Sequence, residues 1–381
     1  MTDRSPSTAY RAFLNQTLVG DSRLWTWLVG IWFAITIWFY GQIILSLPMT
    51  AAAIASEPGG IDAFMQSMPT TNTGGSTFPS LGIALGAPVL AFILWLFRKN
   101  AAGENRKPVL FVAAILAISS FVAIIYSAIS SAGTSQGEVL NTWLERSPWV
   151  YLCMLLMFPP FALALWYFQR KIHKRTILSL HTAASKFRWK RLFFSMIVFW
   201  VIAAAISYIG HTTGSSKAEF VFDPSRFWIY LPITLLFIPL QSATEEIALR
   251  GYLNQGLGHY IKNPLVVFVI TSAAFASLHL GNPEVAEGTA QSSKLMAVSG
   301  YFLFGMFACL LTYIDGGLET AIGVHAANNI FAAAFVGYES SALPTPTVFR
   351  VGLNTEVDTF TTIVALSLVC LVMYVTRRGL E

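Results

Sequence analysis

Long runs of apolar residues alternate with short polar loops along most of the chain. About ten runs are long enough to cross a bilayer as helices, which takes roughly 20 residues each. Lipid offers the backbone no hydrogen-bond partners, and the alternating pattern of barrel strands is absent. The pattern therefore predicts an all-α, polytopic integral membrane bundle of about ten transmembrane helices. The predicted spans are Trp25–Leu47, Phe78–Phe97, Pro108–Ile129, Pro148–Phe168, Leu192–Ile209, Phe227–Arg250, Pro264–Leu280, Leu295–Ile314, Leu318–Val336 and Asp358–Thr376.

Composition supports a surface that faces lipid. Apolar residues make up 55% of the chain and charged residues only 11%, against about 25% charged in soluble domains. The 14% aromatic content excludes a disordered chain. Cys153, Cys309 and Cys370 all fall inside apolar runs without metal-type spacing, so they are interpreted as packing residues.

Lysine and arginine predict the orientation. About 19 of the 24 basic residues fall on the side of the N-terminus when loops are assigned to alternate sides, which predicts that both termini are cytoplasmic. The net charge of +5 follows this loop pattern and does not indicate nucleic-acid binding. Between Lys171 and Lys190, basic and apolar residues interleave. This stretch is typical either of an amphipathic helix on the anionic leaflet or of a plain cytoplasmic connector.

Ionisable residues divide the chain into three parts. The first five spans contain essentially none in their interiors, whereas Glu245, Glu246, Arg250, His279 and His325 gather in later spans. A charge at mid-bilayer costs at least ~2.5 kcal/mol on insertion scales, so these residues indicate a function. The predicted organisation is an N-terminal five-helix region (1–215), a catalytic core (216–340), and a C-terminal transmembrane helix with a short tail (341–381).

Helical spacing places these residues on defined faces. Glu246 and Arg250 stand at i,i+4 in the favourable acid-then-base order and are predicted to pair, while Glu245 points about 100° away. His325 and Asn329 also stand at i,i+4, and this spacing favours Asn329 over its neighbour Asn328. Each motif alone also fits a structural ion pair, a satisfied histidine or an interhelical hydrogen bond. At ~1.5 Å per residue, however, Glu245, His279 and His325 all fall near mid-membrane, which predicts a shared site.

Taken together, three segments resemble the CPBP family of intramembrane proteases (CAAX proteases and bacteriocin-processing enzymes, also called the Abi family). The family patterns Glu-Glu-x-x-x-Arg, Phe-x-x-x-His and His-x-x-x-Asn occur here as Glu245-Glu246…Arg250, Phe275…His279 and His325…Asn329. The resemblance covers residues 227–336 and implies an intramembrane endopeptidase. Its catalytic residues would be Glu245, Glu246, His279, His325 and Asn329, with Arg250 as the pairing residue.

Hydrolysis without a nucleophilic Ser or Cys requires an activated water and a stabiliser for the oxyanion. Glu245 is predicted to be the general base. His279 would hold the water and pass a proton to the leaving amine, while His325 and Asn329 would donate to the tetrahedral oxygen. We favour a mechanism without a cofactor. The alternative is a zinc ion bound by Glu246, His279 and His325, although the His-Glu-x-x-His helix of zincins is absent.

The resemblance implies a membrane-associated protein or peptide as substrate, processed either at a C-terminal CAAX-type tail or at a leader peptide. The predicted location is the bacterial cytoplasmic (inner) membrane, with the lipid bilayer as the surrounding partner. Two other classes of function also fit buried Glu and His residues. They are a non-catalytic membrane partner or immunity protein of the same fold, and a proton-coupled transporter.

Overall fold

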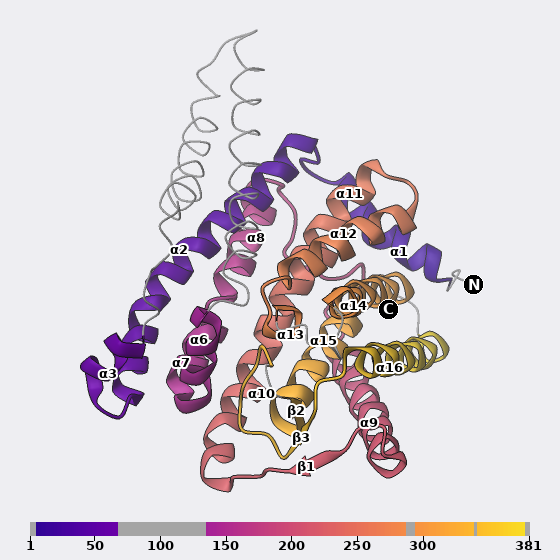
Figure 1. Cartoon of the computed structure of the whole chain (residues 1–381). Coiled ribbons are helices and arrows are strands. Elements are labelled where there is room, and N and C mark those ends of the chain that lie inside the picture. Colours follow the sequence, from indigo (N-terminus) through magenta and orange to yellow (C-terminus); the bar gives the residue numbers. More distant parts are fainter. Residues whose placement is uncertain (1–4, 68–134, 287–293, 339–340, 378–381) are drawn as a thin grey trace.

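Helices dominate residues 5–67, 135–286, 294–338 and 341–377, the part of the chain that the computed structural model describes (Figure 1). The predicted spans Phe78–Phe97 and Pro108–Ile129 lie outside these residues. The first helices are α1 (Pro6–Asn15), α2 (Leu24–Ser56), α3 (Gly60–Ser67), α6 (Ser135–Arg146), α7 (Pro148–Leu156), α8 (Pro159–Lys171) and α9 (Trp189–Thr213). The later ones are α10 (Pro224–Glu246), α11 (Asn254–Tyr260), α12 (Pro264–Leu278), α13 (Pro283–Ala286), α14 (Lys294–Asp315), α15 (Glu319–Ile330) and α16 (Thr355–Val375).

Six helical stretches in the described residues are long and apolar enough to cross a membrane, as expected of an integral membrane protein. They are Leu24–Ser56, Pro148–Lys171, Trp189–Thr213, Pro224–Tyr260, Lys294–Asp315 and Thr355–Val375. Two further predicted spans are shorter than expected: α12 has 15 residues and α15 has 12. The count of about ten and the sidedness of the termini stay predictions.

Three short strands form a sheet that the all-α prediction missed. The strands are β1 (Ala218–Phe220), β2 (Val336–Tyr338) and β3 (Phe349–Val351), in the order β1-β3-β2. The pair β1–β3 is antiparallel and β2–β3 is parallel. Strands of three residues are too short for a periodic pattern to reveal them. The sheet lies at the end of the bundle opposite α11, and it ties together the loops beside α9, α10, α15 and α16 (Figure 1).

Capping residues determine where the helices of the later bundle begin and end. Asp223 caps α10 by accepting from the Ser225 amide at 2.9 Å, and Asn263 caps α12 by accepting from the Leu265 amide at 3.0 Å. A proline occupies the first helical position in both cases, where its missing N–H is not needed. Gly316 ends α14 at φ +62°, and an added Cβ would lie 2.5 Å from the Ala9 carbonyl oxygen. A glycine is therefore required where α1 packs under the α14–α15 turn.

The connector between α8 and α9 is buried, and the amphipathic-helix alternative for it is wrong. Apart from the 3₁₀ turn Leu178–Leu180 it is not helical, and it runs through the interior. His173 and Arg175 are buried in it, and the Arg175 guanidinium donates to the Val19 and Thr17 carbonyls at 2.6 and 3.1 Å. Arg175 thus serves internal packing, whereas Lys171, Lys174 and Lys186 are exposed. The sequence pattern does not show which of the basic residues are buried.

An ion-pair cluster of four residues, Arg188, Arg191, Asp315 and Glu319, joins this connector and α9 to the α14–α15 turn. Arg188 donates from Nε and Nη2 to the two Glu319 oxygens at 3.0 and 2.8 Å. Arg191 binds both Asp315 oxygens at 2.8 and 2.9 Å. Each pair is a two-point, charge-assisted contact, the geometry in which arginine binds carboxylates most strongly.

Two helices widen into π-helical turns directly after their polar motifs. Residues Ile247–Leu253 follow α10, and Phe331–Phe335 follow α15. The first segment leads into α11, so the predicted span Phe227–Arg250 continues to Tyr260. Such segments are rare and often occur at functional sites.

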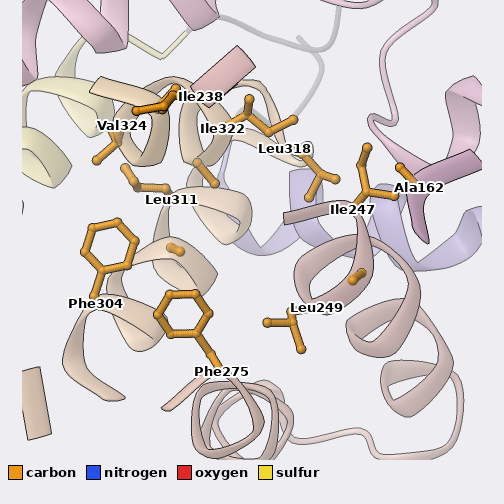
Figure 2. Close-up of a cluster of buried hydrophobic side chains, with 14 of the residues drawn as sticks. Ala162, Ile238, Ile247, Leu249, Phe275, Phe304, Leu311, Leu318, Ile322 and Val324 are labelled. Atoms are coloured by element: carbon orange, nitrogen blue, oxygen red, sulfur yellow. The ribbon is translucent and has the colours of Figure 1, made fainter. Parts of the chain in front are cut away.

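One hydrophobic cluster extends from Tyr10 in α1 to Met373 in α16, and therefore includes both the N-terminal region and the later helices. Figure 2 shows its central part, in which Phe275 and Phe304 lie next to each other. Their rings are stacked with centroids 5.9 Å apart. The division into three regions at residues 215 and 340 stays a prediction. Helix α15 packs closely against α9 at Gly323, where an added Cβ would lie 2.5 Å from the Leu192 carbonyl oxygen.

Candidate active site

Glu246 forms the buried centre of the polar site. Its Oε1 accepts from Arg250 Nη1 at 3.1 Å and from His325 Nδ1 at 2.7 Å. The Glu246 and Arg250 side chains are completely buried and that of His325 is 4% exposed. The structure thus contains the i,i+4 pair expected from the sequence, and brings His325 of α15 against the end of α10. The bond to Glu246 keeps the proton on His325 Nδ1, so that Nε2 faces away from Glu246.

Glu245 lies beside this centre with one oxygen uncommitted. Gln241 Nε2 donates to Glu245 Oε1, and Oε2 lies 3.8 Å from His325 Nε2. That distance is too long for a direct hydrogen bond, and a water lying to the side of the two atoms can hydrogen-bond to both. Glu245 Oε2 is buried and has no hydrogen-bond partner in the described part of the chain. A carboxylate in this state is suited to accept a proton from water.

Asn329 is linked to Glu245 through Gln241. Asn329 Nδ2 donates to Gln241 Oε1 at 3.1 Å and lies 3.5 Å from Ser242 Oγ. Asn328 Nδ2 instead donates to Asn329 Oδ1 at 3.1 Å, and so orients its neighbour. Asn329 is therefore the residue of the two that faces α10.

His279 lies just beyond the end of α12. Its Nδ1 donates to the Phe275 carbonyl at 2.8 Å, which leaves Nε2 as the free nitrogen in the neutral ring. Glu245 and His325 both lie within electrostatic range of the ring. An imidazole with Nδ1 fixed in this way can accept a hydrogen bond from water at Nε2 and can carry a proton afterwards.

Phe275 connects the separate parts of the site. Its ring contacts His279 with centroids 4.4 Å apart and His325 with centroids 5.8 Å apart, and the Arg250 guanidinium lies 4.6 Å above it. The ring is part of the apolar core in Figure 2. Residues of α12, α15 and the π-helical segment therefore meet around one side chain, and Glu246, which binds both Arg250 and His325, joins α10 to them.

Gln241 and Ser242 belong to this network, although the sequence argument did not select them. Gln241 stands four residues before Glu245, so it lies on the same helical face. That spacing was a usable signal. The pattern Phe275…His279 also pointed to Phe275, but only the fold shows that its ring lies against His325 and Arg250 as well.

The donors of the zinc alternative do not form a metal-type cluster. His325 directs its Nδ1 proton at Glu246, so these two groups satisfy each other. Among the described residues, no three His, Cys, Asp or Glu side chains are grouped so that they could hold a metal ion. Arg250 also places a positive charge beside Glu246. We therefore derive no step through a metal, and zinc dependence stays a prediction to be tested.

Several buried polar atoms of the site lack protein partners in the described part of the chain. They are Glu245 Oε2, Glu246 Oε2, Arg250 Nε and Arg250 Nη2. Buried polar groups are otherwise nearly always hydrogen-bonded, so this concentration indicates a place for water or substrate.

The fold and the site together define a helical membrane protein with paired carboxylates and imidazoles around a buried polar centre. Residues 224–331 match the family of Rce1-like proteins, described as type II CAAX prenyl endopeptidase Rce1-like. The matched segment contains every predicted site residue, from Glu245 to Asn329. The resemblance to the CAAX proteases of the CPBP family is therefore confirmed for this part of the chain.

The chain also resembles the uncharacterized protein YyaK of Bacillus subtilis. The two are 34% identical over 179 residues, which is 46% of this chain and 58% of that protein. No solved structure matches the chain. The family match supports a protease in general terms, and the reaction is argued below.

Proposed function

We propose that the protein is an intramembrane endopeptidase in which Glu245 activates a water molecule. The observation that supports this most strongly is the state of Glu245. Its Oε2 is buried, has no hydrogen-bond partner among the described residues, and lies 3.8 Å from His325 Nε2, so that one water to the side of the two atoms can bond to both. In a purely structural pair, both oxygens would be satisfied by neighbouring donors.

The proposed reaction begins when Glu245 takes a proton from the water and the oxygen attacks the substrate carbonyl. His279 Nε2 accepts a hydrogen bond from the same water. His325, protonated on both nitrogens and held by Glu246, donates from Nε2 to the developing oxyanion together with the Asn329 amide. The proton held by Glu245 then passes through His279 to the leaving nitrogen as the C–N bond breaks. One water is consumed, and a carboxylate and an amine are formed.

Burial strengthens each of these interactions. A low local dielectric increases the attraction between the oxyanion and its donors, and the fixed donors need no reorganisation during the reaction. Arg250 compensates the charge of Glu246, and this leaves the charge of Glu245 available for the chemistry. The matched family is described as acting on CAAX prenyl tails. We therefore place the substrate at a membrane-associated tail or leader peptide, and the protein in a bacterial cytoplasmic membrane.

The decisive experiment uses the full chain reconstituted in liposomes. The probes are a reporter peptide with a prenylated CAAX-type C-terminus and a second peptide with a leader-type cleavage site, and products are identified by mass spectrometry. Loss of the general base in Glu245→Gln is expected to lower the cleavage rate by about 10²–10⁴-fold. The same change at the exposed Glu356, in the first turn of α16, is the matched control and should leave the rate unchanged.

Two further measurements complete this test. Comparison of membrane proteomes from cells with wild-type protein and Glu245→Gln shows which cleaved termini depend on Glu245. Exhaustive chelation, with metal analysis of the purified protein, distinguishes the water mechanism from the zinc alternative. Full cleavage by the Glu245→Gln variant would exclude Glu245 as the base.

A further inference from the structure

A third carboxylate lies behind the candidate site, on the short helix α13. Glu284 is 6% exposed and accepts from the Tyr301 hydroxyl. The Asn282 amide donates to the same oxygen, Glu284 Oε1, at 3.2 Å, and to the Tyr301 hydroxyl at 2.8 Å. Glu284 Oε2 is buried without a partner in the described residues. No positively charged side chain forms a salt bridge with Glu284 in that part of the chain, so the fold keeps a net negative charge here.

Tyr301 of α14 connects this charge to His279. The two rings are stacked, with centroids 4.2 Å apart and an angle of 24° between their planes. Phe275 contacts the His279 ring as well, at 4.4 Å and 45°. Both aromatic side chains and the Phe275 carbonyl thus fix the imidazole, and Nε2 stays free.

We propose that Glu284 and Tyr301 are positioning residues that hold the His279 ring and stabilise it while it carries a proton. This inference rests on the proposed function. A phenol that donates to a carboxylate has an electron-rich ring, and the face of such a ring attracts a cation. The stack thus lowers the free energy of the imidazolium that forms when the proton moves towards the leaving nitrogen. Neither residue needs to contact the substrate.

The groups around His279 support an electrostatic role for Glu284 and Tyr301 in addition to a packing role. The titratable groups around the ring are Glu245 of α10, Glu284 of α13, Tyr301 of α14 and His325 of α15. Glu245 is assigned to the water. Glu284 is therefore the remaining carboxylate that can stabilise His279 during the step in which it carries the proton.

The test compares E284Q and Y301F with wild type in the liposome assay with the prenylated reporter peptide. E284Q keeps the acceptor oxygen for Tyr301 but removes the charge, and Y301F keeps the stacked ring but removes the hydroxyl. Each is expected to lower kcat by about tenfold with KM unchanged. In E284Q the acid limb of the kcat/KM profile should move to lower pH by about half a unit or more, because His279 becomes harder to protonate. The exposed Glu356→Gln is again the control.

If Glu284 and Tyr301 only held the His279 ring in place, their substitution would lower activity equally at every pH. An unmoved acid limb in E284Q, with wild-type kcat in Y301F, therefore overturns the proposal. If E284Q does not fold, Y301F decides the question alone, since it preserves the ring packing and an unchanged kcat counts against the stack.

A readout without turnover keeps this inference separate from the proposed function. NMR titration of histidine-labelled protein in micelles follows the His279 ring directly, with its signal assigned from a His279→Asn sample. The midpoint should fall in E284Q relative to wild type. If the reporter peptides are not cleaved by wild type, the proposed function fails. If the midpoint is the same in E284Q and wild type, the Glu284–Tyr301 assignment fails whether or not cleavage occurs.

Discussion

Two groups of buried charges in this protein differ in how completely their polar atoms are satisfied. In the ion-pair cluster, Arg188 and Arg191 each bind both oxygens of a carboxylate, and none of the four side chains has an unpartnered buried atom. In the candidate site, Glu245, Glu246 and Arg250 all retain unpartnered buried atoms. The first arrangement fixes helices, and the second leaves hydrogen-bonding capacity for a ligand. The two groups therefore differ in how fully their buried charges are paired, and the incompletely paired group is the one that holds the predicted site residues.

The largest effect on the free energy of unfolding is expected from a substitution that breaks the ion-pair cluster. Glu319→Gln leaves the Arg188 charge buried without its counter-charge, which costs about 3–5 kcal/mol of unfolding free energy. Chemical unfolding of the purified protein in micelles measures this loss. The control is Glu145→Gln, whose pair with Arg226 is exposed and 3.9 Å long, and which should change stability by less than about 1 kcal/mol. A stable Glu319→Gln protein would contradict the comparison.

Within the candidate site, the larger effects should appear in turnover and not in stability. Asn329→Ala removes the proposed oxyanion donor and should lower kcat by about 10²–10³-fold, or about 2.7–4 kcal/mol in the barrier. Asn328→Ala is the matched neighbour and should have a clearly smaller effect, since its amide only orients Asn329. Single-turnover cleavage with both variants measures the difference. The reverse order of effects would move the oxyanion donor to Asn328.

His173 is a buried histidine outside the membrane-spanning helices, and both of its ring nitrogens are hydrogen-bonded. It donates from Nδ1 to the Asp21 carbonyl at 2.6 Å and accepts at Nε2 from the Tyr252 hydroxyl at 2.8 Å. Burial lowers the pKa of His173 to about 4. The unfolded chain, with a pKa of about 6.5, therefore takes up a proton that the folded protein does not. This contribution to stability is complete above pH ~6.5 and is lost as the pH falls from ~6.5 to ~4, by up to about 3 kcal/mol.

Unfolding at a series of pH values between 7.5 and 4.5 measures this loss. His173→Gln should flatten the pH dependence over this range, while His211→Gln, which changes an exposed histidine, should leave it as in wild type. Parallel pH profiles for wild type and His173→Gln would show that other groups cause the acid sensitivity.

The smallest effect is expected from replacing Gln241, which is hydrogen-bonded to both Asn329 and Glu245. Gln241→Met keeps a side chain of similar length but removes the hydrogen bonds to both residues. The expected result is a decrease of about tenfold in kcat, the value of one net hydrogen bond. Gln241→Glu keeps an acceptor for Asn329 but places a second charge beside Glu245, so the two variants separate the two contacts. Wild-type kcat in Gln241→Met would remove this residue from the network.

Local spacing predicted the parts of this molecule that one helix determines. The Glu246–Arg250 pair follows from i,i+4 geometry, and the apolar runs located the six long helical stretches. Contacts between distant segments had no such signal. Tyr301 meets His279 only because α14 packs beside α12, and the strands β1 to β3 are too short to show a period. For the connector between α8 and α9 the sequence left two interpretations open, because interleaved basic and apolar residues occur both in amphipathic surface helices and in partly buried connectors.

The π-helical segment Ile247–Leu253 makes the register of this protein unusually sensitive to chain length. A wide turn is equivalent to one extra residue in an α-helix, and each residue corresponds to about 100° of rotation. Removal of a single residue between Ile247 and Leu253 would restore regular winding and rotate α10 by about 100° relative to α11. Homologous chains that differ by insertions should therefore place them in the loops and keep this interval constant.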